Sequence, residues 1–346
     1  MSLVTLFWLV SWSVCGVSLA ILIGLVAWRA FANRRADARR LERAGQIELL
    51  KARAERPTDA VGVAASEVLT DLAVEILELV RGDEKARFAE RVARAGAAGR
   101  LHARLDRGGT RTRILAAAAL ANFKDEGSRA ALTCALDDRN PEVRLTAALS
   151  LAANGQAPPP EDVIRRLGIG DHESSLLTVM LLAEMAQTDL ENVRSLLLDA
   201  STAPTVRAAA AEALALCDDF AAVPVITALA IEADPWASEL PRYLAALAEI
   251  EHPMGSPAIL HCLESPSAEV RAAAARAAGR IGVEHALERL DRLLGDPDWW
   301  VRFQAAHALL LLGEKGVARL RRSARRNQEP ARETAALVLA EQADAA

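Results

Sequence analysis

The residues best suited to metal binding or nucleophilic chemistry are scattered along this sequence rather than grouped. A thiol or an imidazole becomes a metal ligand or a nucleophile when a second ligand or a base lies at a fixed short spacing from it. The cysteines show no such spacing, and no glycine-rich phosphate loop, nucleophile elbow or His-Glu-x-x-His motif is present. We therefore expect no cofactor, no small-molecule substrate and no catalysis. The cysteines and histidines of the sequence, none of which we assign to a site, are Cys15, Cys134, Cys217, Cys262, His102, His172, His252, His261, His285 and His307.

Tryptophan supplies the second group of candidates, because exposed tryptophans often carry the binding energy of protein interfaces. Trp299 and Trp300 are adjacent in the sequence. Consecutive helical residues diverge by about 100°, so both rings cannot occupy one core position and at least one is expected to be partly exposed. We predict a partner-binding surface at this pair, with packing against the next unit as the alternative. Trp236 and Tyr243 form a second, weaker candidate.

The charge distribution bears on the class of partner. The chain has a net charge of -5, and residues 29–56 contribute +5 through nine Lys or Arg against four acidic residues, which leaves -10 for the remainder. Binding to phosphate backbones requires clustered cations. We therefore expect protein partners and no nucleic acid.

These candidates lie within a phrase that the sequence repeats, most clearly from Asp296 to Gly313. A Val-Arg pair in this phrase recurs upstream, and we call the place of its arginine the arginine position. The spacing of these positions is nearly constant when Ser175 and Leu240 are counted as substitutes at two of them. Eight units of about 31 residues each indicate a repeat architecture. Arginine occupies the other six positions, which are Arg113, Arg144, Arg207, Arg271, Arg302 and Arg332.

Each unit has room for two helices and two turns, which is how repeats of this length bury apolar surface against their neighbours. The helix with the Val-Arg pair follows an Asp, Asn or Ser with proline nearby, as in Asn140-Pro141, Ser265-Pro266 and Asp296-Pro297. Such residues suit a helix start. No stretch alternates with the two-residue period of a strand. The sequence therefore predicts an all-α solenoid.

The phrase Asp-Pro-x-x-x-Val-Arg followed by Ala-Ala-x-Ala-Leu-x-x-Leu-Gly resembles the HEAT-like repeat, in particular the short variety first associated with phycobilin lyases. The resemblance covers roughly Gly108 to the C-terminus and implies a right-handed α-solenoid of the ARM/HEAT type. It also implies that the acidic residue and the arginine bond between neighbouring turns, so that the six arginines form a structural ladder; a basic binding stripe is the alternative. Ser175 and Leu240 interrupt this ladder, and we expect the solenoid to bend or adapt there.

A second HEAT-like family carries a metal. In the iron-dependent deoxyhypusine hydroxylases, a His-Glu pair recurs in several units and ligates the iron. Only His172-Glu173 matches that pattern in this sequence. The resemblance therefore predicts no metal site.

The N-terminal segment, residues 1–28, predicts a membrane anchor. Residues 2–28 contain no charged side chain, and about 20 such residues span a bilayer as a helix. Basic residues follow the apolar run, so we expect a single-pass plasma (inner) membrane protein with its N-terminus outside and the solenoid in the cytoplasm. Residues 29–57 are expected to form a basic, helical linker that acts as a topology signal or contacts anionic lipid. Its candidates for membrane-surface contact are Arg29, Arg34, Arg35, Arg39, Arg40 and Arg43.

Residues 58–107 lack the repeated phrase and are expected to form an N-terminal helical cap, whereas 108–346 form the solenoid. We interpret the protein as a membrane-anchored, non-catalytic scaffold or adaptor that binds protein partners through its solenoid surface. The resemblance to phycobilin lyases implies an alternative, a chaperone or lyase that presents a prosthetic group to a client protein.

Overall fold

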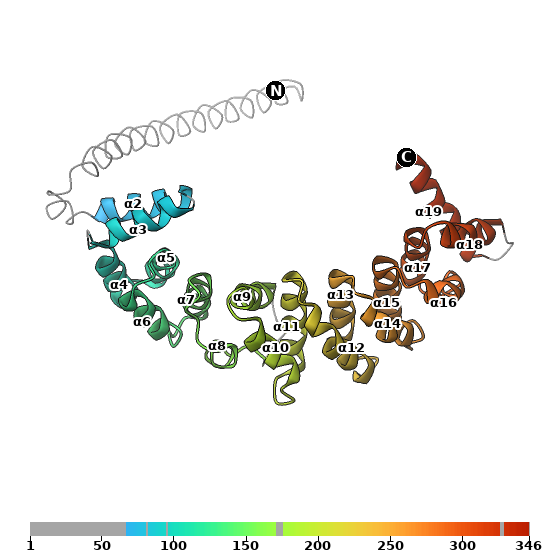
Figure 1. Ribbon diagram of the computed structural model, residues 1–346, viewed down its shortest axis with the longest axis horizontal. Coiled ribbons are helices and arrows are strands. Elements are labelled where there is room, and N and C mark those ends of the chain that lie inside the picture. Colours follow the sequence, from blue (N-terminus) through green and yellow to red (C-terminus); the bar gives the residue numbers. More distant parts are fainter. Residues whose placement is uncertain (1–66, 81, 95, 171–175, 326–328, 346) are drawn as a thin grey trace, which may run out of the picture. The chain divides into compact units, whose positions relative to one another are not determined.

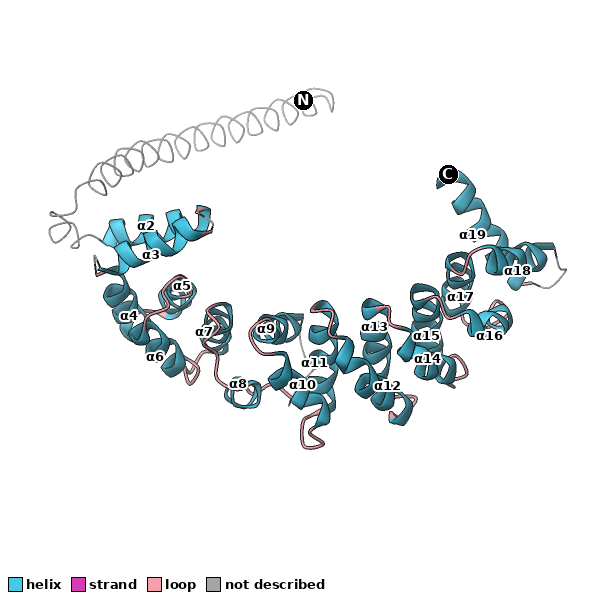
Figure 2. Cartoon of the chain, in the orientation of Figure 1, coloured by secondary structure: helices cyan, strands magenta, loops and turns pink. Residues whose placement is uncertain are grey.

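The computed structural model describes residues 67–80, 82–94, 96–170, 176–325 and 329–345. The chain divides into two compact units, Met1–Ala103 and Arg104–Ala346. All regular structure within the described ranges is helical (Figure 2). This agrees with the predicted all-α class.

The first unit contains α2 (Glu67–Leu79), α3 (Asp83–Arg94) and the start of α4 (Ala97–Arg107). Leu77 and Ala89 are buried. The guanidinium of Arg100, on α4, donates a hydrogen bond of 2.7 Å to the buried hydroxyl of Thr70, on α2. The unit boundary, after Ala103, lies one helical turn before the end of the predicted cap at residue 107.

The second unit is built from two layers of helices, visible as two rows in Figure 1. Consecutive helices pack against one another throughout the first of these layers, and each helix also packs against a helix of the other layer. The longer layer consists of α5 (Thr110–Leu120), α7 (Pro141–Ala153), α9 (Leu176–Ala186), α11 (Pro204–Leu216), α13 (Leu240–Ile250), α15 (Ala268–Ile281), α17 (Trp299–Leu311) and α19 (Ala331–Ala345). The other layer consists of α6 (Glu126–Ala135), α8 (Pro160–Leu167), α10 (Leu190–Leu198), α12 (Val223–Glu232), α14 (Ser256–Cys262), α16 (Leu287–Leu293) and α18 (Glu314–Arg325). Short 3-10 turns, η2 (Phe220–Ala222), η3 (Pro253–Gly255) and η4 (Glu284–Ala286), precede α12, α14 and α16.

Each predicted arginine position belongs to its own helix of the longer layer. Seven of them lie inside these helices, and Ser175 lies outside the described residues, directly before α9. The period read from the sequence therefore corresponds to one helix of this layer per unit.

Small side chains let these helices approach one another closely. Ala208, Ala209, Ala210 and Ala211 on α11 are all fully buried. Gly279 on α15 faces α17, where an added Cβ would lie 2.7 Å from the Cα of Ala308. The distance between packed helices depends on the side chains at the contact, so alanine and glycine set the spacing of this layer.

The predicted helix starts are correct in kind but not in every residue. Asn140 accepts hydrogen bonds from the backbone N–H groups of Glu142 and Val143, with Pro141 in the first turn, as expected. On α17 the capping residue is Asp298, which accepts from Trp300 and Val301. Asp296, which the sequence suggested for this place, has a different role, described below.

The predicted membrane location requires correction. In the part of the chain that the structure describes, no helix is both long and apolar enough to cross a bilayer. That finding overturns the expected localisation as a single-pass membrane protein. The proposed span, 1–28, and the basic linker, 29–57, lie outside the described residues.

Candidate partner-binding surface

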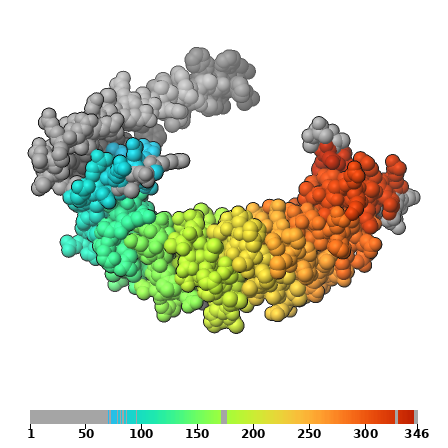
Figure 3. All heavy atoms as spheres, in the orientation of Figure 1, coloured from blue at the N-terminus to red at the C-terminus, as the bar shows by residue number. Residues whose placement is uncertain are grey.

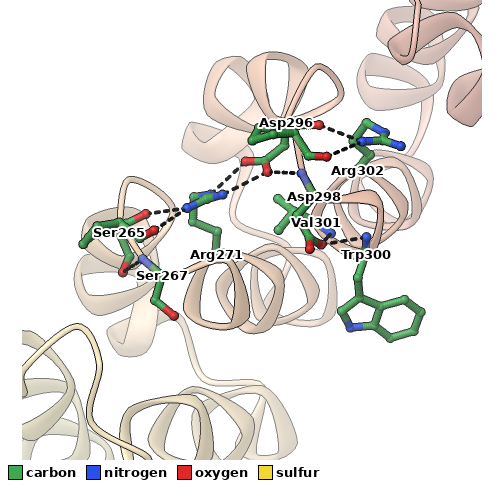
Figure 4. Close-up of polar contacts among 10 residues, drawn as sticks. Ser265, Ser267, Arg271, Asp296, Asp298, Trp300, Val301 and Arg302 are labelled. Atoms are coloured by element: carbon green, nitrogen blue, oxygen red, sulfur yellow. Dashed lines mark hydrogen bonds and ion pairs between the residues drawn. The ribbon is translucent and has the colours of Figure 1, made fainter.

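Two arginine positions meet at a shared aspartate between α15 and α17 (Figure 4). Arg271 donates to the carboxylate of Asp296 through Nε at 2.8 Å and Nη2 at 2.9 Å. Arg302 donates to the backbone carbonyl of Asp296 at 2.8 Å. The carboxylate of Asp296 also accepts the backbone N–H of Asp298. We call such a bridge between two repeats a rung of the ladder. The side chain of Asp296 is only 5% exposed, so this rung is largely shielded from water.

The same arrangement occurs near the start of the second unit. Arg113 donates to the carboxylate of Asp138 at 3.0 Å, and Arg144 donates to the backbone carbonyl of Asp138 at 3.1 Å. Each rung therefore uses one aspartate for two successive arginine positions. Arginine suits this role because its planar fork can donate to several acceptors at once.

The other two predicted ladder arginines make no such rung. The Arg207 side chain makes no hydrogen bond or ion pair to another repeat among the described residues, and its buried Nε is unpaired, as it is in Arg144 and Arg302. Arg332 pairs locally with Glu329, less than one helical turn before it. The six predicted arginines therefore fall into a bridging group and a group that does not bridge.

Two ion pairs between repeats were missed by the sequence analysis. Arg194, on α10, donates twice to Asp219 at 2.9 Å, and Arg242, on α13, donates to Glu212 at 2.8 and 2.7 Å. The first could have been found by spacing, because Arg194 and Asp219 are separated along the chain by the same interval as the bridging pairs Arg113–Asp138 and Arg271–Asp296. Arg242 reaches back to an earlier helix, so this spacing does not reveal it.

The predicted tryptophan pair forms an exposed aromatic cluster on α17. Trp299 and Trp300 are 51% and 50% exposed. Both stack on Phe303, at centroid distances of 5.2 and 5.4 Å with interplanar angles of 18° and 14°. The contacts follow from the helix, because residues three and four apart lie on one face. His307 continues this face one turn further, with its ring 4.5 Å from that of Phe303.

The other side of α17 is buried and holds the cluster in place. Val301, Ala305 and Leu309 have no exposed surface. The N-terminus of α17 is fixed by the Asp298 cap, and the bond from Arg302 to the Asp296 carbonyl anchors its first turn. We call Trp299, Trp300 and Phe303 the α17 aromatic cluster.

The second predicted aromatic pair does not form a surface. Trp236 is 72% exposed in the loop before α13, whereas Tyr243 is 2% exposed on α13 itself. Burial raises the pKa of the Tyr243 phenol. Tyr243 is therefore a core residue, and its assignment as a partner-binding residue is corrected.

A cavity of about 470 Å³ opens beside the repeat in which Leu240 replaces arginine. Its apolar wall includes Ala230, Ala233 and Leu240, and its polar side includes Glu264 and Ser265. Cys262 also lines it, and burial raises the pKa of this thiol to about 11. Because a thiol with so high a pKa is a poor nucleophile near neutral pH, this cavity is better suited to binding than to covalent chemistry.

Several other predicted site residues are not placed by the structure. His172-Glu173 and the six basic residues from Arg29 to Arg43 lie outside the described residues. Within the described ranges, no group of three or more His, Cys, Asp or Glu side chains could hold a metal ion.

Comparisons with known proteins find several similar solved structures. Similar solved structures include a mutant of Kap121p (13% identity, TM-score 0.49, 84% of this chain and 38% of that chain) and human deoxyhypusine hydroxylase (18% identity, TM-score 0.31, 81% and 97%). Another is the complex of CpcE and CpcF of phycocyanin lyase from Nostoc (22% identity, TM-score 0.30, 71% and 87%). No curated protein matches the chain.

A family model for HEAT repeats matches residues 100–173 and 242–340. These ranges make up half of the chain. The stretch between them contains both positions, Ser175 and Leu240, at which the arginine of the repeat is absent. The chain belongs to the HEAT-repeat family.

Proposed function

We propose that this protein is a non-catalytic scaffold that binds a protein partner through its solenoid, and that the α17 aromatic cluster is the main contact. The observation that carries the proposal is the half-exposure of Trp299 and Trp300 on a helix whose opposite face is fully buried. Exposed single apolar residues are ordinary on protein surfaces. Three stacked aromatic rings on one exposed helix face form a contiguous apolar patch, which is typical of an interaction site.

The energetics of the cluster favour a protein ligand. A large aromatic ring offers a wide contact area and loses little rotational freedom on binding, because it has only two side-chain torsions. Stacking on Phe303 already restricts both indoles. A surface that is ordered before binding loses less conformational entropy when the partner arrives. The cluster therefore has the properties of an interface anchor.

The surroundings of the cluster support a partner with polar groups at its rim. Leu311, 62% exposed, lies on the same face of α17 as His307. The imidazole of His307 lies 3.7 Å from the carboxylate of Glu341 on α19. Interfaces commonly combine an apolar centre with a polar rim. This arrangement suits a folded or helical segment of protein better than a small polar metabolite.

The test is capture of partners by the full-length protein in its native cell. Proximity labelling from a C-terminal fusion is compared between the parent and the double variant Trp299→Ala/Trp300→Ala. We expect labelling of specific partners to fall at least about tenfold, because loss of interface anchors commonly costs about 2 kcal/mol or more. Helical content by circular dichroism should stay unchanged, since both rings are half-exposed.

Leu115→Ala is the matched control, because Leu115 is a 61% exposed apolar residue on α5, away from the cluster. It should leave partner labelling unchanged. The proposal fails if the double variant folds normally and labels the same partners as the parent at the same level.

A further inference from the structure

The regular repeats show where the ladder arginine lies. Its guanidinium bonds a carbonyl just before its helix, which is that of Gly108 for Arg113, Pro266 for Arg271 and Pro297 for Arg302. It also bonds a carboxylate at a fixed interval after it, in the rungs that use Asp138 and Asp296. At Arg113 and Arg271 these two positions together define a guanidinium site.

In the repeat with Leu240 the same positions surround a cavity. Pro235 precedes Leu240 by the interval that separates Pro266 from Arg271, and Ser265 follows Leu240 by the interval that separates Arg271 from Asp296. Pro235, Leu240 and Ser265 all line the 470 Å³ space described above. Leucine is shorter than arginine and carries no donor. The cavity therefore occupies the place in which the repeats of Arg113 and Arg271 hold a guanidinium.

A change at the helix start explains why the space is open. α5, α7, α11, α15 and α17 each begin three residues before their arginine position. α13 begins at Leu240 itself, with Pro241 in its first turn. One helical turn is thus replaced by the loop that carries Pro235 and the exposed Trp236.

The acceptors of the absent arginine are available. The carbonyl of Pro235 accepts no hydrogen bond from any described residue, whereas its equivalents Pro266 and Pro297 accept from arginine. Glu264 supplies a carboxylate beside Ser265, at the edge of the cavity. Arg289 and Arg292 both donate to its Oε1. Its Oε2 receives no described hydrogen bond and remains open to a further donor.

We infer that this cavity binds the arginine side chain of a protein partner, which completes the interrupted ladder from outside the chain. The apolar wall of Ala230, Ala233 and Leu240 suits the methylene stem of arginine. The Pro235 carbonyl and Glu264 Oε2 then accept the guanidinium hydrogen bonds. Lysine fits less well, because its ammonium lacks the planar fork that the regular repeats use.

This inference rests on the proposed function, since it names a side chain of the protein partner, but the two can fail separately. The α17 aromatic cluster does not line the cavity. The variant Trp299→Ala/Trp300→Ala should therefore bind an arginine peptide as the parent does.

The test uses the purified full-length chain and a blocked tripeptide, acetyl-Gly-Arg-Gly-amide, titrated by calorimetry or NMR. The matched probe carries citrulline, which keeps the shape of arginine but has no charge. One side chain can supply only weak binding, so we expect a dissociation constant on the order of 1 mM. The citrulline peptide should bind at least about tenfold more weakly, because hydrogen bonds to charged groups are the stronger ones.

Two variants locate the site. Leu240→Arg places the chain's own guanidinium in the cavity and should abolish peptide binding. Glu264→Gln should weaken binding at least about threefold, whereas Glu249→Gln, which alters an exposed carboxylate paired with Arg280 outside the cavity, should not.

The inference is overturned if the arginine and citrulline peptides bind alike, if neither binds at concentrations up to about 10 mM, or if both Leu240→Arg and Glu264→Gln bind as the parent does. Should Leu240→Arg fail to fold by circular dichroism, the comparison of Glu264→Gln with Glu249→Gln decides alone.

Discussion

The repeat around α15 and α17 and the repeat around α13 solve the same packing problem in different ways. In the first, a buried aspartate bridges Arg271 and Arg302. In the second, Leu240 and Tyr243 are buried, and the ion pair runs backwards from Arg242 to Glu212. The buried rung has become an apolar contact, and the remaining ion pair is more exposed, at 25% and 27% for its two side chains. Figure 3 shows that the surface of the second unit continues without a break from one repeat to the other.

This difference shows that a HEAT repeat does not need its rung in order to stack. A buried ion pair can be replaced by apolar residues with little loss of stability, because desolvation offsets much of its Coulomb energy. The core of alanine and leucine continues through both repeats. Compared with the α15 repeat, the α13 repeat lacks the guanidinium and contains a cavity with unused hydrogen-bond acceptors.

The largest expected effect is removal of the bridging aspartate. Asp296→Ala leaves the guanidinium of Arg271 without its carboxylate in a site where its side chain is only 14% exposed. Removing one partner of a buried pair is costly, and we expect a loss of about 3 kcal/mol in the free energy of unfolding. Urea denaturation followed by circular dichroism measures it.

The matched variant in the other repeat is Glu212→Ala, which removes the partner of Arg242. Because that pair is partly solvated, we expect a loss of about 1 kcal/mol or less. Equal losses for the two variants would show that the buried rung and the partly solvated ion pair contribute equally to stability.

Close helix packing should also distinguish the two repeats. In Gly279→Ala the new Cβ would lie 2.7 Å from the Cα of Ala308. Because this Cα belongs to the backbone of α17, the clash can be relieved only if the whole helix shifts. Overpacking of this kind destabilises a core, so we expect a loss of about 2 kcal/mol by the same denaturation measurement.

Gly255→Ala is its counterpart near α13. The new Cβ would lie 3.3 Å from a terminal methyl of Leu247, which can rotate away, and the backbone there is right-handed with φ of -74°. We expect a change within about 1 kcal/mol of the parent. A larger loss here than at Gly279 would mean that the α13 repeat is the more tightly packed of the two.

A further expected effect is on thiol reactivity rather than on stability, and it concerns how well the α13 repeat stays closed. Cys262 lines its cavity but is 2% exposed, and burial raises its pKa to about 11. At pH 8 such a thiol is ionised about a hundredfold less than one with the ordinary pKa of 9.0. Because both ionisation and access are reduced by burial, iodoacetamide labelling resolved by mass spectrometry should modify Cys262 much more slowly than the exposed Cys134.

The rate at Cys262 should rise as the pH approaches about 11. The raised pKa of Cys262 also makes the free energy of unfolding depend on pH. The folded state keeps the Cys262 thiol neutral. The contribution of this buried thiol to stability is therefore complete below the ordinary pKa of 9.0 and is lost as the pH rises through about 11. Labelling of Cys262 as fast as Cys134 at pH 8 would show that this repeat opens readily.

The sequence determined the repeat and its period. The regular spacing of the eight arginine positions predicted one helix of the longer layer per unit, and the structure places the seven described positions in such helices. Alanine-rich helices bounded by proline and capping residues are local patterns, read over one or two turns. The adjacent tryptophans likewise predicted partial exposure, because residues about 100° apart on a helix cannot both face its core.

Only the tertiary structure decided which side chains meet across repeats. Asp296 could serve as a helix cap by its local sequence, yet stacking turns it toward Arg271 and leaves the cap to Asp298. Tyr243 is buried although its sequence neighbourhood includes the exposed Trp236. Such contacts join segments that are distant along the chain, so they depend on how neighbouring helices stack. The cavity beside Leu240 has the same origin, because a missing side chain becomes a space only when its surroundings are assembled from three separate segments of the chain.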